Sequence, residues 1–519
     1  MEQLVRQVVI VGGGSAGWLT AGIIAAEHNA KSSAGIQVTV VESPEVNIIG
    51  VGEGTWPSMR ETLAKIGISE TDLFRECDAS FKQGVKFSKW VSGAEDDHYY
   101  HPFVLPQGYT KTDLVFPWQK QSEKISFADA VSYQGYLCRE GRGPKLISTP
   151  EYAGIANYGY HLDAFKLGQL LQKHCIEKLG VKHVVDHIVN INDADNGDIA
   201  SVTTKQNGDI AGDLFIDCSG MSSILLGKHF NVPFISKQHI LFNNSALAVH
   251  LPYPDDKTPI TSHTGATAQK SGWIWDIALP TRRGVGYVYS SEHTNDHDAE
   301  VELRAYIESS IGKVKADKLS VRKLNFTPGH REKFWHKNCV AIGMSAGFLE
   351  PLEASALVLV ELAAAKISKE MPANRQTMHI LSKRFNKQFL YRWERIIAFL
   401  KMHYILSKRT DTAFWRDNYN PETIPESLQE LITLWKHQPP AAHDFHCAEE
   451  IFPSASWQYI LYGMGFKTQE NSLSRKFVDE DRAKHFFNEN IQLTKKYLSA
   501  LPSNRELIDK IKQYGMQKI

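Results

Sequence analysis

The sequence of 519 residues has no excess of either charge, no paired cysteine motif and no long apolar run. Lysine plus arginine balance aspartate plus glutamate at 58 each, so no net field draws the chain to nucleic acid or to an acidic membrane. No run approaches the ~20 apolar residues of a membrane span, and no signal-peptide pattern opens the chain. We expect a soluble, cytoplasmic protein without nucleic-acid or membrane partners that acts on a small neutral molecule.

The cysteines are few and scattered, without a CxxC pair, which argues against a metal ribbon or a disulfide scaffold. No metal site is predicted. We expect mostly buried, reduced thiols at Cys77, Cys138, Cys175, Cys218, Cys339 and Cys447.

A strand, a glycine-rich turn and a helix open the chain. The β-branched run 8–11 enters Gly12-Gly-Gly-Ser-Ala-Gly17, and residues 18–26 have helical character. A second strand at 36–41 ends in Glu42, which lies 25 positions after Gly17 and close to the usual offset of ~20 for a ribose-binding carboxylate. The first 42 residues therefore predict a nucleotide-binding βαβ unit.

Three glycines of this turn have separate tasks. Gly12 permits the tight bend, Gly14 lets the backbone approach a pyrophosphate, and Gly17 lets the helix pack on the strand. This segment alone leaves flavin and nicotinamide open. The predicted loop residues in contact with the cofactor are Gly12, Gly14, Ser15, Ala16 and Gly17.

Two regions further along complete the coarse organisation. Residues 214–220 end a strand in small polar residues, either at a sheet edge that meets a dinucleotide or as an ordinary turn. From Leu357 onward helical patterns dominate. A mixed α/β front half is thus predicted to pass into a helical rear half.

Five sequence blocks resemble the flavin-dependent tryptophan halogenases: Ile48–Pro57, Ser80–Trp90, Trp273–Ile277, Cys339–Glu353 and Ser407–Arg416. The resemblance implies an α/β, flavoprotein-monooxygenase-like fold of the Rossmann type, with a mixed sheet on the substrate side and a helical C-terminal region. We expect residues 1–355 to form the FAD-binding domain with its interleaved sheet. Residues 356–519 are expected to form a mainly helical region that covers the substrate site.

The resemblance also implies a reaction. In this family reduced FAD and O2 form a C4a-hydroperoxide, chloride or bromide attacks it, and the resulting hypohalous acid passes through a tunnel to an aromatic substrate. A separate flavin reductase supplies diffusible FADH2. A homodimer stays open, and so does the choice of halide. Two rivals stay open as well: a flavin hydroxylase that inserts oxygen directly, and a flavin-binding protein without turnover.

By resemblance, Lys82 is the lysine that holds or captures the oxidant. A buried ammonium donates a hydrogen bond, and burial lowers its pKa toward a reactive amine. The apolar neighbours of Lys82 favour burial, whereas the alternative is a solvated surface lysine. Lys86, four residues on, is a competitor for the same role.

Glu353 matches the second catalytic residue of the family, a carboxylate that stabilises the arenium-like cation and accepts its proton. The alternative is that Glu353 or Glu350 caps a helix that begins near Ala354. The resemblance places halide binding at the backbone amides of Ser355 and Ala356. Ala354, Ser355 and Ala356 stand where the family has Ser-Thr-Gly.

Trp273, Trp275 and Ile277 match a signature proposed to separate flavin from substrate, with Ala278 in place of the family's proline. Alanine restores an N–H and backbone freedom, so this wall is expected to be slightly reshaped. The alternative is bulky core packing.

His101 and Phe103 match the pair that sandwiches an indole in the family, and Phe452 and Trp457 are further expected substrate contacts. The positions that grip the amino-acid end of free tryptophan are occupied by Pro440-Ala441, Cys447 and Ile451-Phe452. Indole or another electron-rich aromatic is therefore expected in preference to free tryptophan.

The remaining expected cofactor contacts are Glu42, Gly50, Gly343 and Gly347. Met344 stands where related flavoproteins place Asp or Asn to hold the ribityl chain. Because methionine cannot make that hydrogen bond, we expect FAD to bind weakly and to exchange.

Overall fold

The computed structural model of the chain describes residues 4–45, 52–447, 449–470 and 478–518. By spatial contact the chain divides into two compact units. The first comprises Met1–Ala79, Leu162–Lys237 and Thr327–Trp393, and the second comprises Ser80–His161, Gln238–Phe326 and Glu394–Ile519. The expected division between residues 355 and 356 stays a prediction, because spatial contact does not test which residues bind the cofactor and which cover the substrate.

The first unit is built on a six-stranded sheet with the order β20-β21-β12-β1-β2-β8. Neighbours pair in parallel except β20, which is antiparallel to β21. Strands buried on both faces are apolar throughout, and Val8, Val9 and Ile10 are at most 1% exposed. The strands are β1 (Gln7–Val11), β2 (Gln37–Glu42), β8 (Lys182–Val185), β12 (Leu214–Asp217), β20 (Trp335–His336) and β21 (Cys339–Ala341).

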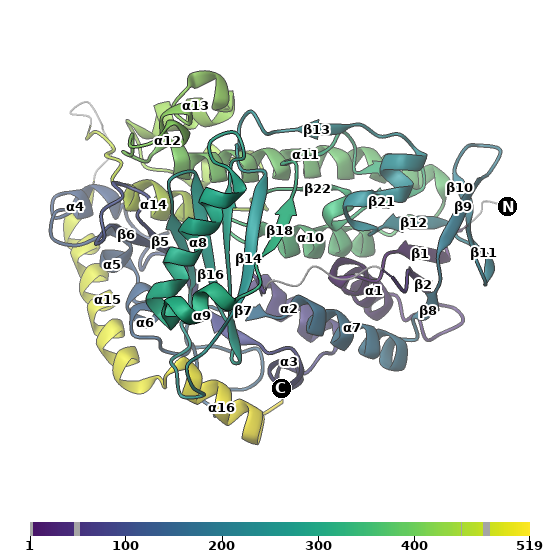
Figure 1. Ribbon diagram of the computed structural model, residues 1–519, viewed down its shortest axis with the longest axis horizontal. Coiled ribbons are helices and arrows are strands. Elements are labelled where there is room, and N and C mark those ends of the chain that lie inside the picture. Colours follow the sequence, from purple (N-terminus) through teal and green to yellow (C-terminus); the bar gives the residue numbers. More distant parts are fainter. Residues whose placement is uncertain (1–3, 46–51, 448, 471–477, 519) are drawn as a thin grey trace. The chain divides into compact units, whose positions relative to one another are not determined.

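Helix α1 (Ser15–Glu27) packs against α7 (Ala164–Leu179) and α10 (Ser355–Lys369) (Figure 1). It begins three residues earlier than the predicted range 18–26, because Gly14 serves as its N-cap. Helix α7 begins where the Asp163 side chain accepts hydrogen bonds from two backbone amides, and it ends at Gly180 in the left-handed conformation.

The other elements of the first unit are short helices and two small antiparallel sheets. They include α2 (Ser58–Ile66), α3 (Glu70–Glu76), β9 (Ile188–Asp193), β10 (Ile199–Thr204), β11 (Gly208–Ala211), β13 (Phe234–Ser236), β19 (Gly329–Arg331) and β22 (Gly347–Phe348), together with the two-residue strand β3 (Glu53–Gly54) and a π-helix at Ile224–His229.

A seven-stranded mixed sheet, with the order β18-β14-β17-β16-β15-β5-β6, organises the second unit. Only the pair β15–β5 is parallel. One face of the sheet is covered by α8 (Asp296–Ile311) (Figure 1). The core between them includes Ile274, Tyr287 and Leu303. The strands are β5 (Gly84–Ser88), β6 (His98–Pro102), β14 (Ser245–Pro252), β15 (Thr264–Ala268), β16 (Gly272–Ala278), β17 (Arg282–Tyr289) and β18 (Arg322–Asn325).

The rear of the chain is helical, as predicted. The long helix α11 (Arg375–Ile405) is followed by α12 (Ala413–Asp417), α13 (Glu426–Trp435), α14 (Ser454–Gly463), α15 (Glu480–Ala500) and α16 (Asn504–Tyr514). Within the described residues no helix combines the length and the apolar character that crossing a membrane requires. Five of the six cysteines are buried, as predicted, and all six are free cysteines.

Candidate active site

The turn after β1 leaves room for a phosphate. Gly12 has φ +116°, and a Cβ there would lie 2.2 Å from the carbonyl oxygen of Cys218. A Cβ at Gly17 would lie 1.9 Å from the Gly12 carbonyl oxygen, so this glycine lets helix and strand approach. A Cβ at Gly14 would meet no atom within 4 Å, and Gly14 gives α1 no side-chain cap. Open space at an uncapped helix start fits the pyrophosphate of FAD.

The parallel strands β21, β12, β1 and β2 bring their carboxyl ends to this turn. Glu42, the last residue of β2, lies against Gly13, where an added Cβ would be 2.1 Å from its Cδ. Its carboxylate is 2.9 Å from His183 Nε2. After β21, Gly343 approaches α1 so closely that a Cβ would be 2.9 Å from Ala16 Cβ. Dinucleotides bind at such carboxyl ends, so the predicted residues fit the cofactor.

The other predicted cofactor residues have varied surroundings. The Ser15 hydroxyl donates to the Ala164 carbonyl oxygen at 2.9 Å and so ties α1 to α7. Gly347 lies in β22, where a Cβ would be 2.5 Å from the Gly329 carbonyl oxygen. Met344 is 38% exposed. Gly50 lies outside the described residues. Contacts of FAD with Ser15, Gly50 and Gly347 stay predictions, whereas Met344 was not among the expected contacts.

A left-handed turn leads into α10. Glu353 and Ala354 have φ of 91° and 52°, and Glu353 is buried. The N-cap of α10 is Ala354, which makes no side-chain cap, so Glu353 is not the N-cap residue. Ser355 is buried and Ala356 is exposed. An uncapped helix start suits an anion, and halide binding by Ser355 and Ala356 stays a prediction.

Glu361 of α10 joins this helix to α2. Its carboxylate accepts hydrogen bonds from Thr62 Oγ1 at 2.6 Å and from Ser58 Oγ at 3.3 Å. Burial raises the pKa of Glu361 from 4.5 to about 7, although both hydroxyl donors act to lower it. Because the folded pKa exceeds the unfolded one, the contribution of Glu361 to stability is complete below pH 4.5 and is lost as the pH rises through about 7.

We therefore expect Glu361→Gln to flatten the pH dependence of stability, since the amide stays neutral and fills the same space. The free energy of unfolding of the wild type should fall by about 2–3 kcal/mol relative to the variant between pH 5 and pH 8.5. Urea denaturation at both pH values measures this difference. Glu61→Gln, at an exposed position of α2, should keep the wild-type pH dependence, and parallel curves for Glu361→Gln would contradict the expectation.

Lys82 is fully buried in strand β4 (Ser80–Lys82), so the alternative of a solvated surface lysine is wrong. Strand β4 pairs with β7 (Gly159–Leu162), and Lys82 lies opposite Gly159, which has no side chain to fill the space. The Lys82 Nζ is 5.4 Å from the centre of the Phe103 ring. Lys86 is only half-buried on β5. Burial favours Lys82 over its competitor, and its catalytic role stays a prediction.

A buried histidine shares this surface of β4 and β7. His161 lies opposite Ser80, and residues two apart on a strand face the same side, so His161 is the diagonal neighbour of Lys82. Burial first, and then the charges of Lys82 and His263, hold the pKa of His161 well below its usual range. Lys82 therefore has a neutral imidazole beside it.

Three of the four predicted substrate contacts converge on one ring, Phe399 of α11. Phe452 stacks on it with centroids 3.8 Å apart, and Trp457 meets it edge-on at 4.8 Å. The ring of His101 in β6 lies 6.0 Å from it. The sequence pattern did not single out Phe399. The available signal was its spacing of four from His403, which places both rings on one helix face at 5.6 Å.

The predicted tryptophan wall occupies one face of β16. The wall consists of Trp273, Trp275 and Ile277, which are each at most 7% exposed. They lie on the face of β16 opposite to Ile274, which belongs to the core packed on α8. The Trp275 ring covers Gly286 of β17, where a Cβ would lie 2.2 Å from it. Among the described residues its Nε1 is buried without a hydrogen-bond partner. Such an N–H fits a wall that faces a bound molecule, and separation of flavin from substrate stays a prediction.

Ala278 keeps β16 in register. It pairs with Arg283 of β17, and its carbonyl oxygen accepts a hydrogen bond from Ser80 Oγ at 2.5 Å. The strand therefore continues to the position where the family has proline.

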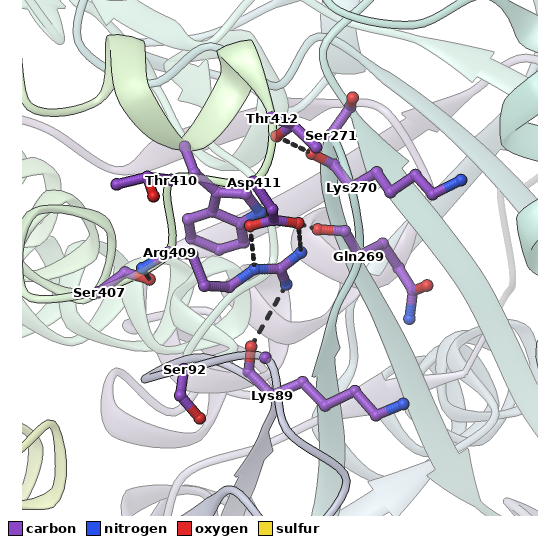
Figure 2. A network of polar contacts seen from close by, with 12 residues as sticks. Lys89, Ser92, Gln269, Lys270, Ser271, Ser407, Arg409, Thr410, Asp411 and Thr412 are labelled. Carbon is purple, nitrogen blue, oxygen red and sulfur yellow. Dashed lines mark hydrogen bonds and ion pairs between the residues drawn. The ribbon is translucent and has the colours of Figure 1, made fainter.

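In the block Ser407–Arg416, the contacts of Arg409, Thr412 and Trp415 form a network that we call the clamp. Figure 2 shows Arg409 at its centre. The Arg409 Nε and Nη2 donate to the Asp411 carboxylate at 3.0 and 2.8 Å, and Nη1 donates to the Lys89 carbonyl oxygen at 3.3 Å. The guanidinium carbon lies 4.6 Å from the centre of the Trp415 ring. Arg409 thereby fixes the turn that follows β5.

The same block holds the turn between β15 and β16. Trp415 Nε1 donates to the Gln269 carbonyl oxygen at 3.0 Å. Thr412 Oγ1 donates to the Lys270 carbonyl oxygen at 2.7 Å (Figure 2). Because β16 begins two residues after Lys270, the clamp sets the start of the strand that carries the tryptophan wall.

Comparison with known proteins agrees with this architecture. The family model described as tryptophan halogenase matches residues 7–480. Tryptophan 6-halogenase SttH of Streptomyces toxytricini is 32% identical over 480 residues, which cover 88% of this chain and 89% of the relative. Tryptophan 7-halogenase RebH of Lentzea aerocolonigenes is 31% identical over 453 residues, or 84% and 83% of the two chains.

Solved structures are similar over the whole length. A tryptophan halogenase from Shewanella frigidimarina superimposes with a TM-score of 0.96 at 49% identity and full coverage of both chains. BrvH, a flavin-dependent halogenase from Brevundimonas sp. BAL3, gives 0.85 at 30% identity, with 98% of this chain and 99% of that chain covered. These similarities confirm the predicted α/β, Rossmann-type fold.

Proposed function

Since the chain belongs to the tryptophan halogenase family and is thus a flavin-dependent halogenase, we propose that it halogenates an indole-type substrate through Lys82. The family uses FADH2, O2 and a halide. When bound, reduced FAD and O2 supply the oxidising equivalents that turn chloride or bromide into hypohalous acid. A separate flavin reductase supplies the FADH2, which exchanges because Met344 offers no hydrogen bond to the ribityl chain.

The burial of Lys82 beside Phe103 is the observation that carries this proposal. An ammonium or amine enclosed by an aromatic ring and a neutral imidazole meets little competition from water, so it can donate to hypohalous acid or be captured by it as a haloamine. Gly159, which lies opposite Lys82, places no side chain against it. Lys82 therefore delivers an electrophilic halogen instead of releasing it.

Glu353 is proposed to act on the ring. Its carboxylate stabilises the positive charge that develops when the halogen adds, and it accepts the proton that leaves the same carbon. The substrate ring is proposed to rest among His101, Phe103, Phe452 and Trp457. The Trp457 N–H donates to the Phe452 carbonyl oxygen at 3.1 Å. Trp457 is therefore proposed to contact the substrate through its ring and not through a hydrogen bond. An aromatic slot of this kind suits a neutral indole.

Incubation of the protein with flavin reductase, NADH, FAD, indole and either bromide or chloride tests the proposal by mass spectrometry. We expect a monohalogenated indole that requires added halide. A hydroxylated product that forms without halide would instead identify a flavin monooxygenase. Flavin binding without any product would identify a non-catalytic flavin protein.

A further inference from the structure

The turn that carries Glu353 has an unusual backbone. Glu353 and Ala354 are consecutive non-glycine residues with positive φ, at 91° and 52°. L residues avoid this region because Cβ crowds the backbone, and such turns persist only where the surrounding contacts hold them. Within the turn, the Ala354 N–H donates to the Pro351 carbonyl oxygen at 2.9 Å.

A tryptophan distant in sequence holds this turn. Trp56 Nε1 donates to the Glu353 carbonyl oxygen at 2.7 Å, across 297 positions of the chain. The indole has a single N–H at a fixed place on a rigid ring, so the bond defines the direction of the Glu353 carbonyl. Pro57 follows Trp56 and restricts its backbone to extended conformations.

The helices on either side of this bond are fastened to each other. Trp56 lies two residues before α2, and Glu353 lies two residues before α10. Glu361 of α10 accepts hydrogen bonds from Thr62 and Ser58 of α2, at 2.6 and 3.3 Å. Trp56 and Glu353 therefore precede two helices that are hydrogen-bonded to each other. Because α2 and α10 are held together in this way, the bond from Trp56 can keep the strained turn at Glu353 in place.

We propose that Trp56 is a positioning residue for Glu353. This inference rests on the proposed function, in which the Glu353 carboxylate meets the substrate ring. With its carbonyl held, the peptide after Glu353 cannot rotate toward a relaxed conformation, so the side chain keeps the direction that the reaction needs. Without the N–H, the turn relaxes and the carboxylate moves away, while the fold and the other binding residues stay in place.

The decisive experiment is a double-mutant cycle with Trp56→Phe and Glu353→Gln. Because a displacement of about 1 Å costs up to ~10²-fold in rate, we expect Trp56→Phe to lower kcat for halogenation by ~10- to 10²-fold, with KM for indole changed less than about threefold. Glu353→Gln should lower kcat by ~10²-fold or more. The double variant should be no slower than Glu353→Gln, since Trp56 acts only through Glu353. If the loss of kcat in the double variant equals the product of the two single losses, the proposal is wrong.

Trp335→Phe is the matched control. Its indole Nε1 also donates to a backbone carbonyl oxygen, that of Lys337 at 3.1 Å, and it belongs to the same unit. We expect kcat for Trp335→Phe within about twofold of the wild type. If Trp335→Phe lowers kcat as much as Trp56→Phe does, the loss in Trp56→Phe reflects removal of any buried tryptophan and not the bond to Glu353. If Trp56→Phe does not fold, β-(3-benzothienyl)alanine at position 56 keeps the ring volume, replaces the N–H with sulfur and should give the same loss.

The outcomes separate this inference from the function on which it rests. A wild type without halogenated product, or a Glu353→Gln variant as fast as the wild type, would refute the proposed chemistry. An active wild type with a slow Glu353→Gln and an unimpaired Trp56→Phe would refute only the positioning role.

Discussion

Replacement of Lys82 by methionine is expected to lower halogenation by about 10³-fold or more while FAD binding stays unchanged. Methionine nearly keeps the volume of the fully buried side chain, so the strand β4 and the Phe103 contact should survive. What is lost is the nitrogen that holds the hypohalous acid. Halogenated indole measured by mass spectrometry and FAD titration by fluorescence give the two readouts.

Lys86→Met is the control for this prediction, because Lys86 lies four residues on and is only half-buried. Its activity should stay within a few-fold of the wild type. If Lys82→Met remains active and Lys86→Met does not, the two lysines exchange roles. If neither variant loses activity, the oxidant reaches the substrate without a lysine.

Replacement of Arg409 by alanine is expected to lower the free energy of unfolding by about 3–4 kcal/mol. Arg409 is 8% exposed and makes the paired bonds to Asp411 and the bond to the Lys89 carbonyl (Figure 2). It also contacts the Trp415 ring. Alanine removes all of these and leaves a cavity. Urea denaturation followed by tryptophan fluorescence measures the loss.

Two further variants show whether the fork of Arg409 or its charge matters. Arg409→Lys keeps the charge without the planar fork and should recover less than half of the loss. Arg416→Ala removes an exposed arginine of the same block and should cost less than about 1 kcal/mol. Equal costs for Arg409→Ala and Arg416→Ala would show that the network contributes little to stability.

Several features of this protein depend only on neighbours along the chain and could be predicted without the structure. The strand 8–11, the turn from Gly12 to Gly17 and the second strand up to Glu42 were predictable, because apolar patterning and glycine conformation are local properties. The five motif blocks likewise identified the family, since short stretches carry them. The start of α1 was placed late, because a glycine N-cap has no side-chain signal to mark it.

The contacts between residues that are distant in sequence could not be predicted, because they depend on how the whole chain folds. Lys82 is buried because β7 and Phe103 lie against it, and no pattern around Lys82 encodes those partners. The Phe399 ring gains its place only when β6 and α14 approach α11. Trp56 and Glu353 are 297 positions apart and are joined by one hydrogen bond. Such pairings arise from chain folding in three dimensions, which sequence spacing does not record.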